Sequence, residues 1–312
     1  MAYPSYNHPV AKRPKIEPTW NPTLFEMNKP EQAVSLVSKP KGERLFYESG
    51  LLLGTSAFTA NGWPGTFYPA GMKPADYLTF YATKFKTVEI DSTYYGPPSS
   101  STVTGWRDKT PPDFIFSAKV PQAITCDKVL VDCEAEFHQF ITTMDILGEK
   151  LGPLVLQFPY FERWKFPKQE DFLAVLRPFL EKLPTDHKFA IEIRNKTWFN
   201  AVLADLLRDY KIALVLQDSP LMPRPWEFKE EVDFVTADFV YVRWLGDRKR
   251  IEEQTNTWDK TVVDRHEDLT KWVELFRQFL SRDLKVYAYA NNHYAGNSPA
   301  TVKLFWELYR QR

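Results

Sequence analysis

Short apolar runs alternate with longer segments of helical periodicity from residue 51 to the end of the chain. Eight of these runs have the length of buried strands and are bounded by turn-forming residues. The predicted strands occupy residues 51–56, 87–91, 114–119, 154–159, 188–194, 212–218, 239–244 and 285–291. Nearly all are followed by a helical segment, so the chain is predicted to be an α/β protein. Eight strand–helix units over about 260 residues match a TIM-like (β/α)8 barrel in both number and length.

The helical segments have recognisable starting residues. They are predicted near residues 74–85, 99–106, 133–147, 169–183, 199–210 and 264–280, with a last helix after the eighth strand. We expect Ser298 to be the N-cap of that last helix and Pro299 its first residue, because serine favours N-caps and proline favours the first turn. The proline-rich segment after the sixth strand predicts no clear helix.

A doubly wound open sheet is the alternative architecture. Such a sheet normally carries a glycine-rich phosphate-binding loop after its first strand. Here the first strand ends in Gly54-Thr55-Ser56, which lacks the required glycine spacing. This difference favours the barrel.

Residues 1–50 differ from the rest of the chain. They are rich in proline, lysine and polar residues and show no sustained periodicity. We interpret them as an N-terminal extension that is disordered or laid over the surface, and we expect it to contribute little to the core of a barrel domain at 51–312. The basic run Lys12-Arg13-Pro14-Lys15 fits a solvated charge cluster better than a targeting signal, since so short a motif often matches by chance.

The composition narrows the classes of protein to consider. Apolar residues make up 44% of the chain and charged residues 26%, as in a soluble globular protein. Lys plus Arg and Asp plus Glu both number 40, so no overall charge attracts nucleic acid or a membrane surface. No apolar run approaches the roughly 18 residues of a membrane-spanning helix, and the N-terminus lacks the apolar core of a signal peptide. We expect Cys126 and Cys133 to be reduced thiols in a cytoplasmic protein, and no zinc-site spacing occurs.

Charged and polar residues interrupt the apolar strands mainly at their C-terminal ends. These residues are Glu89, Asp91, Lys119, Gln157, Glu192, Arg194, Asp218, Arg243, Asn291 and His293. Side chains two positions apart share a face of a strand, so Glu192 and Arg194 point the same way, as do Tyr241 and Arg243. Active sites of barrels are built at the C-terminal ends of the strands. We therefore predict that these side chains surround one pocket, although ion pairs that only close the barrel are the structural alternative.

This pattern predicts an enzyme that acts on a small anionic substrate by general acid/base chemistry. A phosphorylated compound is one form of such a substrate. The predicted catalytic residues are Glu192, Glu89, Asp218 and His293. The predicted substrate-binding residues are Lys119, Arg194, Arg243, Asn291, Gln157, Tyr94 and Trp198. We expect an anion to lie near Arg243 and the backbone of residues 296–298, with Gly246 and Gly296 allowing close approach. The reaction stays open between hydrolase, lyase and isomerase.

Several motifs resemble those of a known family. They are Gly54-Thr55-Ser56, Phe67-Tyr68-Pro69, Val88 to Tyr95, Leu147 to Pro153, Glu192-Ile193-Arg194, Tyr241-Val242-Arg243 and Asn291-Asn292-His293. In this order they resemble the domain of unknown function 72 family, the YecE-like proteins, over residues 51–312. The resemblance implies a TIM-like barrel and supplies no function. The chain differs from the family pattern at Cys126 and Asn195, where the family tends to have histidine.

Three other functions are weighed against this prediction. Glu89, Glu192, Asp218 and His293 could instead hold the metal of an isomerase or hydrolase, although three nearby cations oppose it. A glycosidase needs two suitably spaced carboxylates, but Gln157 and Arg243 stand at the strand ends where barrel glycosidases usually place them. A non-catalytic binding protein is the third, and the neutral net charge does not indicate nucleic acid as its partner. No cofactor or oligomeric state is inferred.

Overall fold

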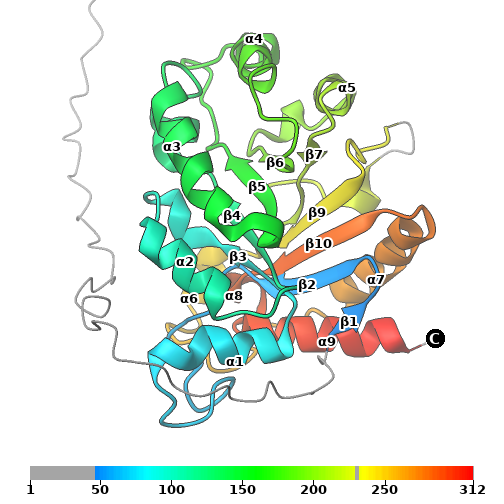
Figure 1. Ribbon diagram of the computed structural model, residues 1–312. Helices are drawn as coiled ribbons and strands as arrows, with labels where there is room; N and C mark the ends of the chain where they lie inside the picture. The colour runs from blue at the N-terminus through cyan, green and yellow to red at the C-terminus, as the bar shows by residue number, and fades with distance from the viewer. Residues whose placement is uncertain (1–45, 229–231, 312) are drawn as a thin grey trace, which may run out of the picture. The chain divides into compact units, whose positions relative to one another are not determined.

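The computed structural model of the chain describes residues 46–228 and 232–311 (Figure 1). Most of the predicted extension, residues 1–45, lies outside this range. Its last part belongs to the fold, because Tyr47–Glu48 form a short strand, β1, that pairs antiparallel with β2, and Phe46 is buried. The residues that pair with the first predicted strand thus include some that precede residue 50.

The strands form two five-stranded sheets, in the orders β1-β2-β10-β9-β8 and β3-β4-β5-β6-β7. Apart from β1, neighbouring strands are parallel. Their bounds are β2 Leu51–Thr55, β3 Thr87–Ile90, β4 Ile115–Lys119, β5 Leu151–Gln157, β6 Phe189–Glu192, β7 Ala213–Leu214, β8 Leu216–Asp218, β9 Phe239–Trp244 and β10 Lys285–Ala290. All eight predicted strands are thus confirmed, and the sixth is divided into β7 and β8 at Val215.

The predicted single closed barrel is not found as one continuous hydrogen-bonded sheet. The α/β class and the parallel strands are confirmed, but the ladder is interrupted between β2 and β3. The two backbones still touch there, since a Cβ added to Gly54 would lie 2.3 Å from the Thr87 carbonyl oxygen. A tyrosine fills the gap in the ladder: the Tyr81 hydroxyl accepts from the Thr55 amide (3.0 Å) and donates to the Thr87 carbonyl (3.1 Å).

We expect the substitution Tyr81→Phe to lower the free energy of unfolding by about 1–3 kcal/mol. The hydroxyl is buried, and its loss leaves two backbone groups of β2 and β3 without a partner. Urea denaturation measures the change. Tyr77→Phe, on the same helix, is the control, because the Tyr77 hydroxyl bonds to no other residue that the structure describes. Equal effects of the two substitutions would contradict this role of Tyr81.

Helices flank the sheets (Figure 1). Their bounds are α1 Tyr77–Lys84, α2 Ser100–Asp108, α3 Glu134–Met144, α4 Gln169–Leu180, α5 Ala201–Asp209, α6 Arg248–Glu252, α7 His266–Ser281, α8 Asn292–Ala295 and α9 Ser298–Arg310. The predicted start of the second helix near residue 99 is confirmed, because Ser99 is its N-cap and the Ser99 hydroxyl accepts from the Thr102 amide at 3.2 Å. The short helices α6 and α8 were not predicted, and in the described residues of the segment between β8 and β9 the helical structure is a 3-10 turn, Pro225–Glu227.

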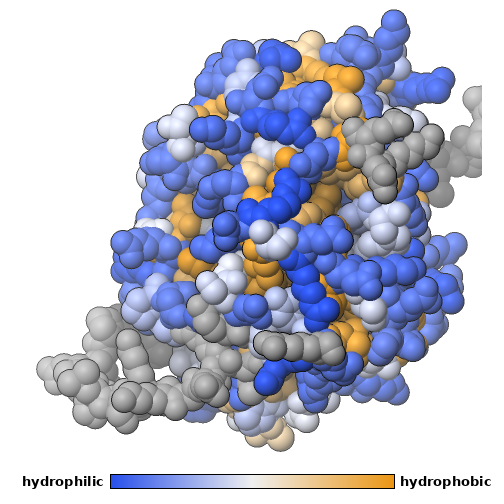
Figure 2. All heavy atoms as spheres, turned by 90° about the vertical axis from the view of Figure 1, so that its right-hand side faces the viewer, coloured by the Kyte–Doolittle hydropathy of each residue, from blue (hydrophilic) through white to orange (hydrophobic). Residues whose placement is uncertain are grey.

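The strands separate two buried clusters. The larger lies between the strands and the helices and includes Val242, Trp244 and Ala288. The smaller combines residues of both sheets, and its face of the strands is called the inner face here: Leu52, Val155, Ala190, Ala213, Val215, Phe239, Tyr241, Tyr287 and Tyr289. The predicted alternation along the fifth and seventh strands is therefore confirmed, and the eighth strand follows the same rule. On the side where β9 and β10 begin, the surface is mainly hydrophilic, with hydrophobic residues visible between the polar ones (Figure 2).

Candidate functional site

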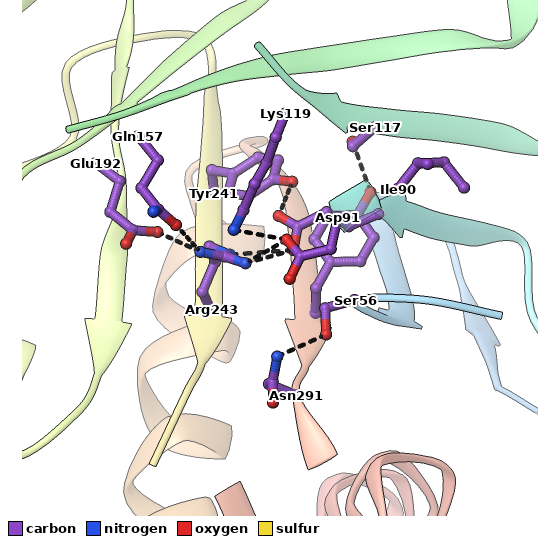
Figure 3. Close-up of polar contacts among 12 residues, drawn as sticks. Ser56, Ile90, Asp91, Ser117, Lys119, Gln157, Glu192, Tyr241, Arg243 and Asn291 are labelled. Atoms are coloured by element: carbon purple, nitrogen blue, oxygen red, sulfur yellow. Dashed lines mark hydrogen bonds and ion pairs between the residues drawn. The ribbon is translucent and has the colours of Figure 1, made fainter. Parts of the chain in front are cut away.

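Arg243, at the C-terminal end of β9, is the centre of a polar network on the inner face (Figure 3). Its side chain is 1% exposed, and all three guanidinium nitrogens donate to side-chain oxygens. Nε and Nη2 donate to Glu89 Oε1 at 3.1 and 2.8 Å, and Nη2 also donates to Asp91 Oδ1 at 3.0 Å. Nη1 donates to Glu192 Oε2 at 2.6 Å and to Gln157 Oε1 at 3.0 Å. One cation thus contacts side chains from three different strands: Glu89 on β3, Gln157 on β5 and Glu192 on β6.

Glu89 is a fully buried carboxylate of this network and contacts Arg243. Its second oxygen, Oε2, accepts from the Tyr241 hydroxyl at 2.6 Å. Burial raises the pKa of Glu89, and the attraction of Arg243 opposes this rise. The same burial, together with the charge of Glu89, raises the pKa of Tyr241, so this phenol keeps its proton and remains a donor.

Glu192 lies on the other side of Arg243 and is also fully buried. It contacts Arg243 through Oε2 and Arg194 Nη2 through Oε1, the latter at 2.5 Å. Burial alone would raise the pKa of Glu192, but the attraction of Arg194 and Arg243 outweighs it and lowers the pKa to about 2. Glu192 is therefore ionised at neutral pH.

Asp91 and Lys119 form the rim of the network. Lys119 Nζ lies 2.7 Å from Asp91 Oδ1 and 5.2 Å from the centre of the Tyr94 ring, in a cation–π contact. Asp91 is the most accessible carboxylate of the network, with a side chain that is 31% exposed. Burial would raise its pKa, but the attraction of Lys119 and Arg243 outweighs this and lowers it.

Arg194 lies beside Glu192 in the same network. Its side chain is 25% exposed, and apart from Glu192 it has one weak contact, from Nη2 to Gln157 Oε1 at 3.5 Å. Its Nε has no hydrogen-bond partner among the described residues. Three carboxylates and three cations thus meet at the ends of the strands: Glu89, Asp91, Glu192, Lys119, Arg194 and Arg243. The cations at the rim keep donors that the network does not use.

Comparison with protein-family models identifies the family of the chain. The family model described as "Protein of unknown function DUF72" matches residues 52–312. The chain belongs to the DUF72 family. The resemblance seen in the sequence motifs is thereby confirmed.

Two relatives of this DUF72 protein have names that describe no activity. The chain is 33% identical to the UPF0759 protein YecE of Escherichia coli K12 over 122 residues, 39% of this chain and 43% of that protein. It is 28% identical to the UPF0759 protein YunF of Bacillus subtilis over 147 residues, 45% of this chain and 50% of that protein. The chain therefore spans about half the length of the curated relatives it matches.

Solved structures of the DUF72 family support the fold. A crystal structure of a DUF72 family protein from Thermotoga maritima is similar with a TM-score of 0.64 and 27% identity, covering 82% of this chain and 97% of that one. A DUF72 family protein from Enterococcus faecalis is similar with a TM-score of 0.61 and 22% identity, covering 84% of this chain and 96% of that one.

No helix in the described part of the chain is long and apolar enough to cross a membrane.

The structure brings most of the predicted site residues of this DUF72 protein together. They are Glu89, Lys119, Gln157, Glu192, Arg194 and Arg243, with Tyr94 against Lys119. Asn291 lies on the same face but donates to Ser56 Oγ at 3.0 Å (Figure 3).

Asp218 does not join this network, and its predicted place in the pocket is wrong. Its Oδ1 accepts from Arg224 Nε at 2.8 Å, and its Oδ2 accepts from Trp272 Nε1 at 3.0 Å and from the Tyr294 hydroxyl at 2.8 Å. Asp218 pairs in register with Trp244, which lies under the helices. The neighbouring residue Gln217 faces inward instead.

Trp198 and His293 also lie away from the Arg243 network. Trp198 is buried and stacks on Phe172, with ring centres 5.2 Å apart, so it packs in the core instead of the pocket. The His293 ring contacts Asn291 Oδ1 at 2.7 Å and Glu252 Oε1 at 3.1 Å, and burial lowers its pKa. These two predicted placements are therefore wrong.

The predicted anion site at residues 296–298 is also wrong. The N-cap of α9 is Asn297, whose side chain accepts from the Ala300 amide. The amides of Gly296 and Ser298 already donate to the Asn292 carbonyl (2.7 Å) and to Asn292 Oδ1 (2.9 Å). At Gly246, a Cβ would lie 2.3 Å from the His293 carbonyl oxygen, so this glycine allows α8 to pack closely.

The predicted metal ligands do not converge. Glu89 and Glu192 are separated by Arg243, while Asp218 and His293 have the partners described above. In residues 46–228 and 232–311, no three side chains of His, Cys, Asp or Glu are grouped as metal ligands. The arrangement favours a site that works through ion pairs.

Several residues of the site were not among the predicted catalytic or substrate-binding residues. Asp91 and Tyr241 are central, and the signal for them was their two-residue spacing from Glu89 and Arg243. At the two positions that depart from the family pattern, the Cys126 thiol contacts the Tyr94 hydroxyl at 3.0 Å, while Asn195 bonds the backbone of Phe161 through both side-chain atoms. Cys126 therefore lies next to the network through Tyr94, and Asn195 has a structural role.

Proposed function

We propose that this DUF72 protein is an enzyme that acts on a small anionic substrate at the C-terminal ends of its strands, arranged as a TIM-like barrel. Lys119 and Arg194 hold the anion. The observation that carries the proposal is that Arg243 uses its donors more fully than Lys119 and Arg194 do in the same network. Arg243 has a side-chain acceptor for every guanidinium nitrogen, whereas Lys119 Nζ has one carboxylate partner and Arg194 Nε has no partner in the described part of the chain.

Asp91 is the general base in this proposal. Its lowered pKa keeps it ionised at neutral pH, and its Oδ2 accepts no hydrogen bond from another described residue. A carboxylate in this state can take a proton from a substrate held by the adjacent Lys119. The two predicted catalytic glutamates are less suited to this role, because both are fully buried and both oxygens of each contact a donor group.

Arg243 and the two glutamates have a positioning role. The planar guanidinium contacts three carboxylates, Glu89 through two nitrogens and Asp91 and Glu192 through one nitrogen each, so the orientation of Asp91 is set before a substrate arrives. Since these groups need no reorientation during the reaction, the network is preorganised for proton transfer near a bound anion.

The two cysteines of the protein, Cys126 and Cys133, are free thiols. Thiols without a disulfide fit a reducing, cytoplasmic environment.

A panel of small carboxylates and phosphate monoesters, screened by thermal shift and then by calorimetry, tests the proposal. We expect Lys119→Gln and Arg194→Gln each to weaken a bound anion by about tenfold or more, because each removes a charge-assisted hydrogen bond. Lys128→Gln is the control, since Lys128 is an exposed lysine that pairs with Glu136. For a substrate that is turned over, Asp91→Asn should retain binding and lower kcat by about 100-fold or more.

Two results would contradict parts of this proposal. Anion binding that is unchanged in both Lys119→Gln and Arg194→Gln would exclude the pocket as the binding site. Specific binding without turnover of any member of the panel would instead favour a non-catalytic binding protein, the alternative that the sequence also allows.

A further inference from the structure

A polar cavity lies on the other side of β8 from the Arg243 network. It has a volume of about 140 Å³ and is bordered by the segments that follow β8 and β9 and by the segment that precedes α7. Its lining residues include Ser219, Arg224, Gly246, Arg250 and Arg265. Asp218 also lines it and, as described above, faces away from Arg243. The cavity is therefore separate from the proposed substrate pocket.

Three arginines from three different segments face this cavity. Arg224 donates through Nε to Asp218, but its two terminal nitrogens lie 3.9 Å from Glu227 and 3.7 Å from Asp268, beyond hydrogen-bond distance. The Arg250 guanidinium has no ion-pair partner in the part of the chain that the structure describes. Donors for a further acceptor are thus available on two sides.

Arg265 contributes the third side. Its Nε donates to the Tyr294 carbonyl at 2.9 Å and its Nη1 to Asp268 at 3.2 Å, which leaves Nη2 without a bonded partner among the described residues. Among the lining residues, Arg224, Arg250 and Arg265 outnumber the acids Asp218 and Asp247 by one. Asp218 is already bound by three donors, so it does not compete for the free arginine groups.

Ser219 provides an independent indication of a ligand. Ser219 is 5% exposed, and its hydroxyl has no hydrogen-bond partner among the described residues. Buried hydroxyls are normally hydrogen-bonded, so an unpartnered one beside a polar cavity calls for an explanation. An oxygen of a bound ligand would accept from this hydroxyl and from the arginines together.

We propose that this cavity binds a phosphate group. Arginines bind phosphate oxygens through charge-assisted, often two-pronged hydrogen bonds, and several donors that converge from different segments suit a tetrahedral anion. The cavity volume of about 140 Å³ is well above the roughly 10–15 Å³ that one water molecule needs, so there is room for a group as large as a phosphate. The excess of guanidinium groups disfavours a metal cation in the same place. The site is additional to the substrate pocket and does not depend on it.

Calorimetry with inorganic phosphate tests the proposal in a double variant, Lys119→Gln with Arg194→Gln, which lacks the anion ligands of the substrate pocket. We expect one phosphate to bind to this variant. Adding Ser219→Ala should weaken that binding about five- to tenfold, and adding Arg250→Gln should weaken it about tenfold or more. Arg248→Gln is the matched control, because Arg248 lies on the same helix, pairs with Glu252 and does not line the cavity.

The same measurement with phenyl phosphate distinguishes the source of the phosphate group. Phenyl phosphate that binds at least as tightly as inorganic phosphate indicates the phosphoryl group of a larger molecule, whereas much weaker binding indicates the free ion. Thermal denaturation without phosphate gives a second readout: Ser219→Ala should unfold at the same or a higher temperature, since it removes an unpartnered buried hydroxyl. The proposal is overturned by the absence of saturable phosphate binding in the double variant, or by binding that neither Ser219→Ala nor Arg250→Gln weakens.

Discussion

Replacing Arg243 by methionine is expected to lower the free energy of unfolding by about 4 kcal/mol or more. The substitution keeps a long side chain on the inner face but removes the cation that contacts Glu89, Asp91 and Glu192. Breaking a buried ion pair from one side costs about 3–5 kcal/mol, because the remaining charge is left uncompensated. Here two fully buried carboxylates lose the same partner. Chemical denaturation followed by tryptophan fluorescence measures the change.

Two further variants show whether the loss comes from the unpaired carboxylates. Arg248→Met removes an exposed arginine that pairs with Glu252 four residues later, and such pairs contribute only about 0.3–0.5 kcal/mol. Adding Glu89→Gln and Glu192→Gln to Arg243→Met should restore much of the stability, since no buried charge then lacks a partner. A triple variant as unstable as Arg243→Met alone would mean that packing, and not charge, explains the loss.

The second large effect is expected for Glu192→Gln, and it should depend on pH. The pKa of Glu192 falls from an ordinary value of 4.5 to about 2 in the folded protein. A carboxyl group with a depressed folded pKa stabilises the fold above its unfolded pKa, and this contribution is lost as the pH falls toward the folded pKa. The shift corresponds to about 3 kcal/mol. The wild-type protein should therefore exceed Glu192→Gln in stability most at pH 6–7, and the difference should shrink between about pH 4.5 and 2.

Parallel denaturation curves of both proteins at a series of pH values measure this difference. Glu267→Gln is the control, because Glu267 is an exposed carboxylate paired with Lys271 on α7. Its effect should be small at every pH. A difference between wild type and Glu192→Gln that stays constant from pH 7 to pH 2 would show that the ionised form of Glu192 is not what the fold stabilises.

The sequence predicted the inner face of most strands correctly. Tyr241 and Arg243 on β9, and Tyr287 and Tyr289 on β10, face inward as the two-residue alternation requires. The same alternation also held for the sixth strand, where Ala213 and Val215 face inward and Asp218 outward. Asp218 was assigned to the pocket because it is charged, against the alternation of its own strand. Periodicity was the better guide there, because the pleat of a strand fixes side-chain direction whatever the residue type.

By itself, the sequence determined the strand positions, their order along the chain, most of their facing residues and the family, because these depend on local patterns of apolar and polar residues. The tertiary structure alone decided which acids share Arg243, how Tyr81 bridges β2 and β3, and that Asn297 and not Ser298 caps α9. The first two of these depend on contacts between different strands and helices, as when Arg243 meets Glu89 across 154 positions. The angle and separation of such groups are set by how strands and helices pack, and no local pattern of residues contains that information.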